Sequence, residues 1–207
     1  DQKRKNTDYI KQMELINADD EEERIDLKEM FYKTVSNPAI RRCELMVRMR
    51  GFEELAKRMG YVGEFYTLTA PSAYHASAQK GFNTKWNFSN PKDTQRYLCN
   101  VWAKVRASLA RQDIKLFGFR VAEPHHDGTP HWHMLFFMLP EQIDAVRATF
   151  LRYALEIDGD EAGATTHRFT AKAIDEAKGS ATGYIAKYIA KNIDGYAMDD
   201  ELDDETG

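Results

Sequence analysis

Hydrophobic and polar positions recur with two different periods along the chain, and the period predicts which segments are helices and which are strands. Residues 17–60 have the pattern of helices. Asn37 followed by Pro38 is typical of a helix cap with proline at the first helical position, and Gly51 and Gly60 mark helix ends. This part of the chain is therefore expected to form a helical arm.

Four later segments are predicted to be strands. Residues 64–69 alternate between two sets of side chains and stop at Pro71, and residues 167–174 form another short strand. Residues 116–123 and 131–139 are joined by a connection rich in turn formers. We expect these two strands to pair as a hairpin.

Helices are predicted between the strands. Asn90 and Pro91 begin a long helix, and residues 142–156 and 180–194 form two more, the last of which ends at Gly195. Together these segments indicate an α+β fold, a central antiparallel sheet flanked by helices. The apolar stripe of the long helix consists of Leu98, Val101, Trp102, Val105 and Leu109.

Composition narrows the class of protein. The chain has 207 residues, of which 43% are hydrophobic and 30% charged, as expected for a soluble globular domain. No apolar run approaches the roughly 18 to 20 residues that span a bilayer, so a cytoplasmic protein without a membrane partner is expected. Cys43 and Cys99 have no CxxC spacing and are expected to be core residues. The chain begins with Asp1, and we expect it to be a segment of a longer protein.

The charge is unevenly distributed. The net charge is −4, but residues 1–26 hold 5 basic and 9 acidic residues, and residues 193–207 hold 0 and 7. Residues 27–192 therefore keep 24 basic against 17 acidic residues, a surplus of +7. Such a surplus suits phosphate binding through counterion release, and an ordinary solvated surface is the alternative.

The predicted hairpin brings together a set of metal ligands. His131 and His133 project from one face of their strand, about 7 Å apart along the backbone, with Trp132 on the other face. Simple antiparallel pairing places Glu123 opposite His131 and Val121 opposite His133, so Glu123 shares the histidine face. Two imidazoles and a carboxylate can hold a divalent ion with open positions, and magnesium or manganese suits such a site better than zinc.

The sequence also allows other roles for these histidines. The pair can be ordinary core histidines in a sheet. The position beside a polar loop, where water and substrate can enter, favours a metal site instead. His125, His126 and Asp127 are rival third ligands, and His75 can also approach.

A repeated Tyr-Ile-Ala-Lys tetrad lies in the last predicted helix. Tyr184, Lys187, Tyr188 and Lys191 share one helical face, and we expect the buried stripe on the other. A phenol is a poor nucleophile at neutral pH unless a cation or metal favours the phenolate, and lysines one turn away supply such a cation. Alternatively, the tyrosines only cover the rim of the helix. The expected stripe consists of Ile185, Ala186, Ile189, Ala190 and Ile193.

These motifs together resemble those of the HUH endonucleases, and most closely the phage replication gene A proteins. The resemblance rests on Pro130-His131-Trp132-His133, on the preceding residues 123–129, and on Tyr184-x-x-x-Tyr188. Residues 65–72 and 180–183 are similar to segments of the same family. The resemblance spans roughly residues 61–196, and three motifs in order are more specific than any one alone.

The resemblance implies a site and a reaction. His131 and His133 would be metal ligands, Glu123 the third ligand, and Tyr184 and Tyr188 paired nucleophiles. Lys187 and Lys191 are added as catalytic candidates on their helical spacing from the tyrosines. The implied function is initiation of rolling-circle replication, by nicking and joining single-stranded DNA at a replication origin through a 5′-phosphotyrosine. The implied setting is the cytoplasm of a bacterial host, with a polymerase that extends the free 3′-hydroxyl. Because the sequence contains no GxxxxGK phosphate loop, strand separation is expected to come from a separate helicase or from segments that this sequence lacks.

Three domains are expected on this basis: a helical arm over residues 1–60, a nicking and joining domain over residues 61–196, and an acidic tail over residues 197–207. Three other functions fit parts of the pattern. They are a transposase or relaxase with the same chemistry, a non-catalytic module that binds single-stranded DNA, and a metal-dependent hydrolase that uses water.

Overall fold

The structure is a computed structural model that describes residues 9–19, 24–78, 81–175, 177 and 179–193. The chain divides into two compact units, one of residues 1–48 with 190–207 and one of residues 49–189. No helix among the described residues is long and apolar enough to cross a membrane. The predicted acidic tail, residues 197–207, lies outside the described part of the chain.

The smaller unit is only partly the predicted helical arm. Strands β1 (Glu14–Ile16) and β2 (Arg24–Asp26) pair antiparallel, so the expectation of helix from residue 17 is wrong for β2. Arg24 forms an ion pair of 3.3 Å with Glu14 across this ladder. Backbone pairing with β1 and this ion pair favour an extended conformation at residues 24–26, which accounts for the difference.

Two helices follow, and they are close to the prediction. Helix α2 spans Leu27–Lys33, and α3 spans Pro38–Met59 with the Asn37 side chain accepting a hydrogen bond from the Ala39 amide. Gly60, with a φ of +68°, follows the last helical residue as predicted. Gly51 does not end a helix, because strong helix formers on both sides outweigh the cost of one glycine.

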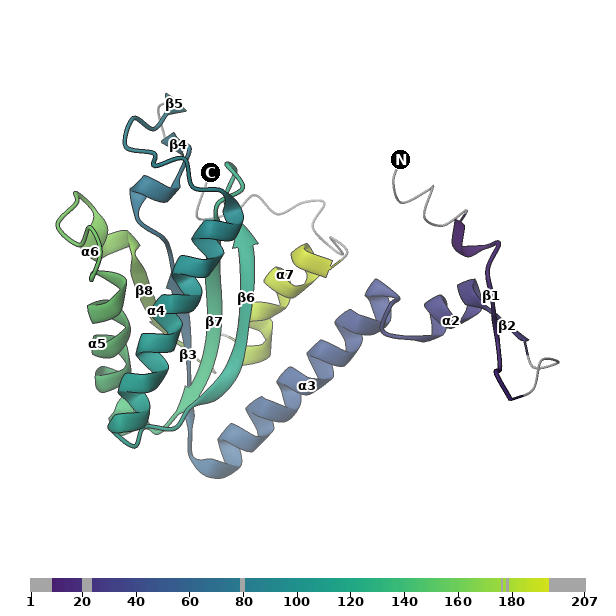
Figure 1. The fold of residues 1–207 in the computed structure, drawn as a ribbon. Coiled ribbons are helices and arrows are strands. Elements are labelled where there is room, and N and C mark those ends of the chain that lie inside the picture. The colour runs from purple at the N-terminus through teal and green to yellow at the C-terminus, as the bar shows by residue number, and fades with distance from the viewer. Residues whose placement is uncertain (1–8, 20–23, 79–80, 176, 178, 194–207) are drawn as a thin grey trace. The chain divides into compact units, whose positions relative to one another are not determined.

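The larger unit is built on a four-stranded antiparallel sheet in the order β6-β7-β3-β8, which confirms the α+β class (Figure 1). Its strands are β3 (Val62–Leu68), β6 (Phe117–Pro124), β7 (Pro130–Met138) and β8 (Phe169–Ala173). Each of these strands begins and ends within two residues of the predicted bounds. Strand β7 is central and buried along nearly its whole length.

Helices α4 (Pro91–Arg111) and α5 (Ile143–Ala154) cover one face of the sheet (Figure 1). Asn90 caps α4 in a capping box with Asp93, which fixes where this helix begins. The predicted stripe of α4 is buried, although Trp102 only in part. Cys99 on α4 and Cys43 on α3 are exposed, so the prediction that both are core residues is wrong. The stripe of α4 leaves Cys99 on the solvent side, and the buried residues of α3 all lie C-terminal to Cys43, from Met49 onward.

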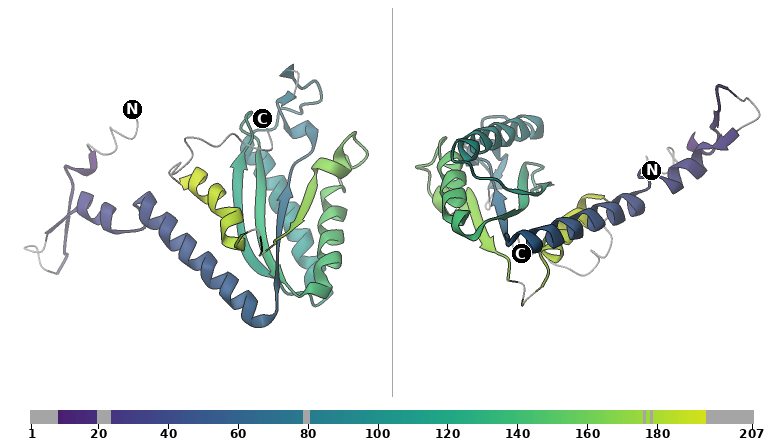
Figure 2. Two further views of the ribbon diagram at one scale, coloured as in Figure 1. Left: turned by 180° about the vertical axis from the view of Figure 1, so that it is seen from behind. Right: turned by 90° about the horizontal axis from the view of Figure 1, so that it is seen from below.

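The opposite face of the sheet is covered by residues 181–189 of α7 (Ala181–Ile193) and by residues 49–59 of α3 (Figure 2). Phe52 on α3 packs against Phe117 and Phe119 of β6, with ring centroids 5.5 and 4.9 Å apart. Ile185 and Ile189 of α7 are buried as predicted. The shorter elements are η1 (Ser72–Tyr74), β4 (Ser77–Ala78), β5 (Gly81–Phe82), η2 (Pro140–Gln142) and α6 (Ala164–His167).

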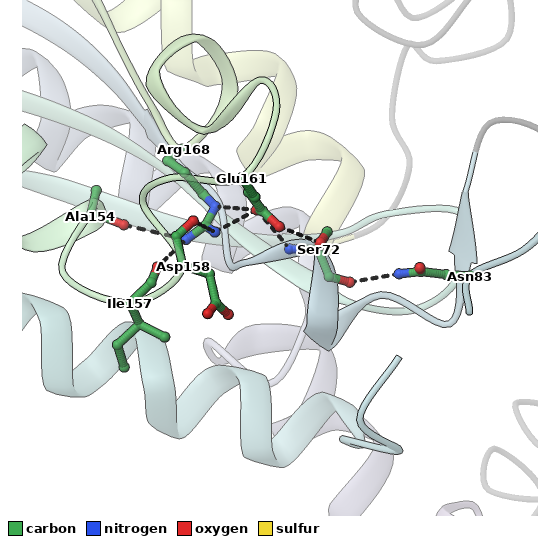
Figure 3. A network of polar contacts seen from close by, with 7 residues as sticks. All are labelled: Ser72, Asn83, Ala154, Ile157, Asp158, Glu161 and Arg168. Carbon is green, nitrogen blue, oxygen red and sulfur yellow. Dashed lines mark hydrogen bonds and ion pairs between the residues drawn. The ribbon is translucent and has the colours of Figure 1, made fainter. Parts of the chain in front are cut away.

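A buried arginine ties the loops at one end of the sheet together (Figure 3). Arg168 is 2% exposed and donates to the carbonyl oxygens of Ala154, Ile157 and Asp158 at 3.0 to 3.4 Å. Its guanidinium also pairs with Glu161, which accepts hydrogen bonds from the backbone and hydroxyl groups of Ser72. The loop after β3 is thereby fixed to the segment before β8.

This network gives a stability prediction. Replacing Glu161 by alanine leaves the Arg168 charge buried without its carboxylate, so the free energy of unfolding should fall by about 3 kcal/mol. Replacing Glu156, whose ion pair with Lys104 is exposed, should cost at most about 1 kcal/mol. Urea denaturation of the two variants measures the difference, and equal midpoints would contradict the role of Glu161.

The same carboxylate makes the stability depend on pH. Burial alone would raise the pKa of Glu161, but the Ser72 hydroxyl and the Arg168 guanidinium hold it below its ordinary value of 4.5. The folded state therefore binds this proton less readily than the unfolded state. Its contribution is present above pH 4.5 and is lost as the pH falls below that value.

Candidate metal centre and tyrosine helix

The β6–β7 hairpin has the predicted register. Glu123 pairs with His131 and Val121 pairs with His133, which confirms the alignment expected from the length of the connection. Because side chains alternate along a strand, all three candidate ligands project from one face of the sheet. Trp132 projects from the other face and is fully buried in the core against α4.

The three side chains converge on one point. The Nε2 atoms of His131 and His133 are 2.8 Å apart, and the Glu123 Oε2 atom lies 3.0 Å from His133 Nε2 and 3.9 Å from His131 Nε2. One donor atom from each residue lies within 4.8 Å of the other two. Two imidazole nitrogens and one carboxylate oxygen at these separations form a donor set that can hold a divalent ion.

The group is more buried than its place beside a polar loop suggests. Glu123 is 4% exposed, His131 7% and His133 1%. The ring of Phe65 on β3 is stacked on His133 at a centroid distance of 5.6 Å, and the ring of Tyr188 on α7 at 3.8 Å. The sheet and α7 thus enclose the ligands from two sides.

Thr67 is a supporting residue that the sequence analysis did not single out. Strand β3 places it opposite His133, and its Oγ1 atom lies 3.2 Å from His133 Nδ1. A hydrogen bond at Nδ1 fixes the orientation of the ring and leaves Nε2 for a metal. The alternation of residues 64–69 places Thr67 on one face of its strand, but the pairing of β3 with β7 is not readable from the sequence.

The rival third ligands are placed differently. His126 is exposed. Asp127 forms an ion pair of 3.3 Å with His75 and accepts a hydrogen bond from the Thr129 amide. His125 packs against His131 at a centroid distance of 4.0 Å, and burial lowers its pKa to about 4. Among these candidates Glu123 lies closest to both histidines, whereas Asp127 and His75 pair with each other.

The two tyrosines of α7 have unequal surroundings. Tyr188 is 8% exposed, stacked on His133, with Phe65 at a centroid distance of 5.5 Å. Tyr184 is half-buried, and its ring lies 6.5 Å from that of Phe65. The prediction that both tyrosines lie opposite the buried stripe is therefore wrong for Tyr188, because the aromatic surface of the sheet extends beyond the two isoleucines.

Cations lie beside both phenol rings. Lys187 is exposed, with its Nζ atom 5.0 Å from the centroid of the Tyr188 ring. Lys172 on β8, which the sequence analysis missed, has its Nζ atom 5.2 Å from the centroid of the Tyr184 ring. Lys191 is exposed and belongs to the other compact unit. Both distances are within the range of a cation–π contact.

Glu53 of α3 fixes the beginning of α7. Its carboxylate is 7% exposed and accepts hydrogen bonds from the backbone amides of Ala181 and Thr182, at 3.3 and 3.2 Å, and from the Thr182 hydroxyl at 2.7 Å. Burial alone would raise the pKa of Glu53, but these hydrogen bonds hold it below its ordinary value. A carboxylate at a helix N-terminus also stabilises the helix dipole.

Removing this cap should loosen the tyrosine helix. Glu53→Ala leaves two amides of the first turn without their acceptor, at a cost of about 1 to 2 kcal/mol. We expect faster hydrogen exchange of the amides of α7 than in the wild type. Glu54→Ala, on the same helix but exposed, is the control and should leave α7 unchanged. Equal exchange in the two variants would show that Glu53 does not position α7.

Comparison with known proteins gives a consistent result. The bacteriophage replication gene A protein family matches residues 1–196. The replication gene A protein of Escherichia phage 186 is 58% identical over 211 residues, which cover 100% of this chain and 30% of that protein. The replication gene A protein of Escherichia phage P2 is 49% identical, over 98% of this chain and 28% of that protein.

A third relative is named for a nuclease activity. A probable replication endonuclease from a prophage-like region of Salmonella typhi is 39% identical, over 100% of this chain and 26% of that protein. The chain thus spans less than a third of the length of these curated relatives. No solved structure matches. The chain belongs to the bacteriophage replication gene A protein family.

Proposed function

We propose that this chain holds the DNA nicking and joining site of a rolling-circle replication initiator, of the HUH endonuclease type. The observation that carries the proposal is the contact between the two motifs: the ring of Tyr188 lies on His133, a member of the buried Glu123-His131-His133 group. A candidate nucleophile thus lies in contact with a candidate metal centre. The names of the relatives, replication gene A protein and probable replication endonuclease, agree with this function.

The reaction follows from the chemistry of a phenol. The Oη atom of Tyr184 or Tyr188 attacks the scissile phosphorus and loses its proton, while the bond from phosphorus to the 3′ oxygen breaks and that oxygen gains a proton. The products are a 5′-phosphotyrosine and a free 3′-hydroxyl, which a polymerase can extend. Rejoining is the reverse step, so it needs no nucleoside triphosphate.

The surrounding residues have separate tasks in this proposal. Lys187 and Lys172 place positive charge beside the phenols, and Lys191 continues the basic side of α7. Thr67 holds the His133 ring in place. A divalent ion, magnesium or manganese, would be held by Glu123, His131 and His133 and would polarise the scissile phosphate. The substrate is single-stranded DNA at an origin in the host cytoplasm, made available by a separate helicase.

The test is a search for covalently linked DNA. The full chain is incubated with single-stranded oligonucleotides and manganese, and a protein-DNA band that survives denaturing electrophoresis is expected. Cleavage without an adduct would indicate a hydrolase that uses water. Binding without cleavage would indicate a DNA-binding module. Strand transfer that favours transposon ends over origin sequences would indicate a transposase or relaxase instead of an initiator.

A further inference from the structure

An aromatic segment lies outside the site described above, in the connection between β3 and α4. Residues 65–92 contain no aspartate or glutamate, although the chain holds 33 of them, and include Lys80, Lys85 and Lys92. Within this stretch Phe82 is 68% exposed and Phe88 77% exposed. Large aromatic rings at such exposure, in a basic stretch of chain, need a reason other than packing.

The two exposed rings are joined by the half-buried ring of Trp86. The centroid of the Trp86 ring lies 4.8 Å from that of Phe88 and 6.1 Å from that of Phe82. The indole N–H of Trp86 donates to the Ser89 carbonyl oxygen at 3.2 Å. We call Phe82, Trp86 and Phe88 the aromatic platform.

The platform is held in place by the polar atoms beneath it. The Asn83 side chain donates hydrogen bonds to the carbonyl oxygens of Ser72 and His75 at 2.7 and 2.8 Å, and the Asn87 amide donates to Ala73 at 2.9 Å. Ser72 is in turn held by Glu161 (Figure 3). The rings are therefore presented on a fixed backbone.

Phe88 is held in an unfavourable backbone conformation. Its φ is +64°, a region that a bulky side chain rarely adopts and that costs of order 1 kcal/mol or more. The ring gains little from burial in return, because it is more exposed than any other described large hydrophobic side chain. Strain of this kind without a packing benefit is typical of a functional position.

The platform is attached to the end of the sheet that carries the candidate metal centre (Figure 1). The Thr129 hydroxyl donates to the Tyr74 carbonyl oxygen at 3.3 Å, and Asp127 pairs with His75. Thr129 and Asp127 lie in the turn between β6 and β7, the strands that carry Glu123 and His131. The β6–β7 turn thus connects the strands of the candidate metal centre to the segment that leads into the platform.

We infer that the aromatic platform binds single-stranded DNA by stacking on unpaired bases next to the scissile phosphate, with Lys85 near the backbone of the DNA. This inference rests on the proposed function and adds a substrate-binding element to it. Aromatic rings beside lysines are the usual means of binding single strands, because every base presents a stacking face and every nucleotide a negative charge. Paired bases in a duplex do not offer these faces.

The experiment measures binding apart from cleavage. The full chain is titrated against a fluorescein-labelled single-stranded oligonucleotide in EDTA, and anisotropy gives the dissociation constant. We expect the double variant Phe82→Ala, Phe88→Ala to bind at least about tenfold more weakly, since stacking on each base contributes about fivefold or more. Phe82→Tyr with Phe88→Tyr keeps both rings and should bind like the wild type. Tyr32→Ala removes an exposed ring elsewhere and is the control.

Phe88→Gly separates binding from folding. Glycine accepts a positive φ without strain, so the thermal midpoint should be unchanged or higher while binding weakens. A lower thermal midpoint of Phe88→Gly would show that Phe88 has a structural role. If the double alanine variant bound DNA with wild-type affinity, the inference would be overturned, and a protein partner would be the alternative ligand of the platform. If the oligonucleotide assay with manganese gives no adduct but the alanine variant loses binding, only the proposed chemistry fails.

Discussion

His131→Asn and His133→Asn are each expected to slow formation of the covalent adduct at least about a hundredfold, while affinity for single-stranded DNA stays within about threefold. In the proposed mechanism each imidazole would supply one of the three donors to the ion. Its loss would remove several kcal/mol of charge stabilisation at the phosphate, where 1.4 kcal/mol is about tenfold in rate. Asparagine at position 133 can still form a hydrogen bond with Thr67, as His133 Nδ1 does, but it has no counterpart of the Nε2 atom that would bind the metal. Adduct formation is followed by gel electrophoresis, and affinity by anisotropy in EDTA.

Metal removal should have the same effect on the wild type. Chelation should abolish adduct formation, and manganese or magnesium should restore it. His126→Asn changes an exposed histidine in the same hairpin and should leave both rate and metal dependence unchanged. If the His131, His133 double variant formed adduct at the normal rate in chelator, the metal centre would be wrongly assigned.

Glu123→Gln tests the third ligand. The amide keeps the shape of the side chain but removes the charge that favours a cation, so more manganese should be needed for half-maximal rate. Glu123 is 4% exposed and close to both histidines, and hence this effect should exceed that of Asp127→Asn, which alters the ion pair with His75. An unchanged manganese requirement would transfer the third role to another residue, with His125 next in position.

The local features of the fold were predictable because they depend on neighbouring residues. The seven residues between Glu123 and His131 set the register of the hairpin, and Asn90 with Pro91 set the beginning of α4. These features were sufficient to place the three candidate ligands on one face. That prediction needs only the identity of the three side chains and the alternation of side chains along a strand. It does not depend on the rest of the sheet.

Contacts between distant segments could not be predicted. The pairing of β3 with β7, which places Thr67 beside His133, and the hydrogen bonds of Glu53 to the first turn of α7 join residues far apart in sequence. The predicted aliphatic stripe of α7 gave its buried face correctly at Ile185 and Ile189, whereas Ala186, Ala190 and Ile193 are only half-buried. Tyr188 is buried as well because the sheet presents aromatic rings to it, and helix periodicity contains no information about the opposing surface.

The double variant Tyr184→Phe, Tyr188→Phe is expected to form no covalent adduct, a loss limited only by the sensitivity of the assay. Phenylalanine removes the attacking oxygen but keeps the ring, so the stacking of residue 188 on His133 is preserved. The thermal midpoint and the affinity for single-stranded DNA should therefore stay close to those of the wild type. Tyr153→Phe, on the opposite face of the sheet, is the matched control and should form adduct normally.

The single variants are expected to differ from each other, because the two phenols have different surroundings. Tyr188 is buried against His133, whereas Tyr184 is half-buried beside Phe65 and Lys172. If the two residues act in turn, at least one single variant should cleave once and then fail in the second transfer, so that adduct or unjoined strand accumulates. A time course with one labelled strand and one acceptor strand separates the two steps.

Mapping of the wild-type adduct completes this test. Proteolysis and mass spectrometry should place the DNA on Tyr184 or Tyr188, since one helical turn brings both within reach of the same region of the sheet. An adduct on Tyr66 is excluded by its position, because Tyr66 is fully buried in the core on the other face and burial raises its pKa. An adduct on Tyr74, or cleavage by the double phenylalanine variant, would remove α7 from the mechanism while leaving the metal centre in place.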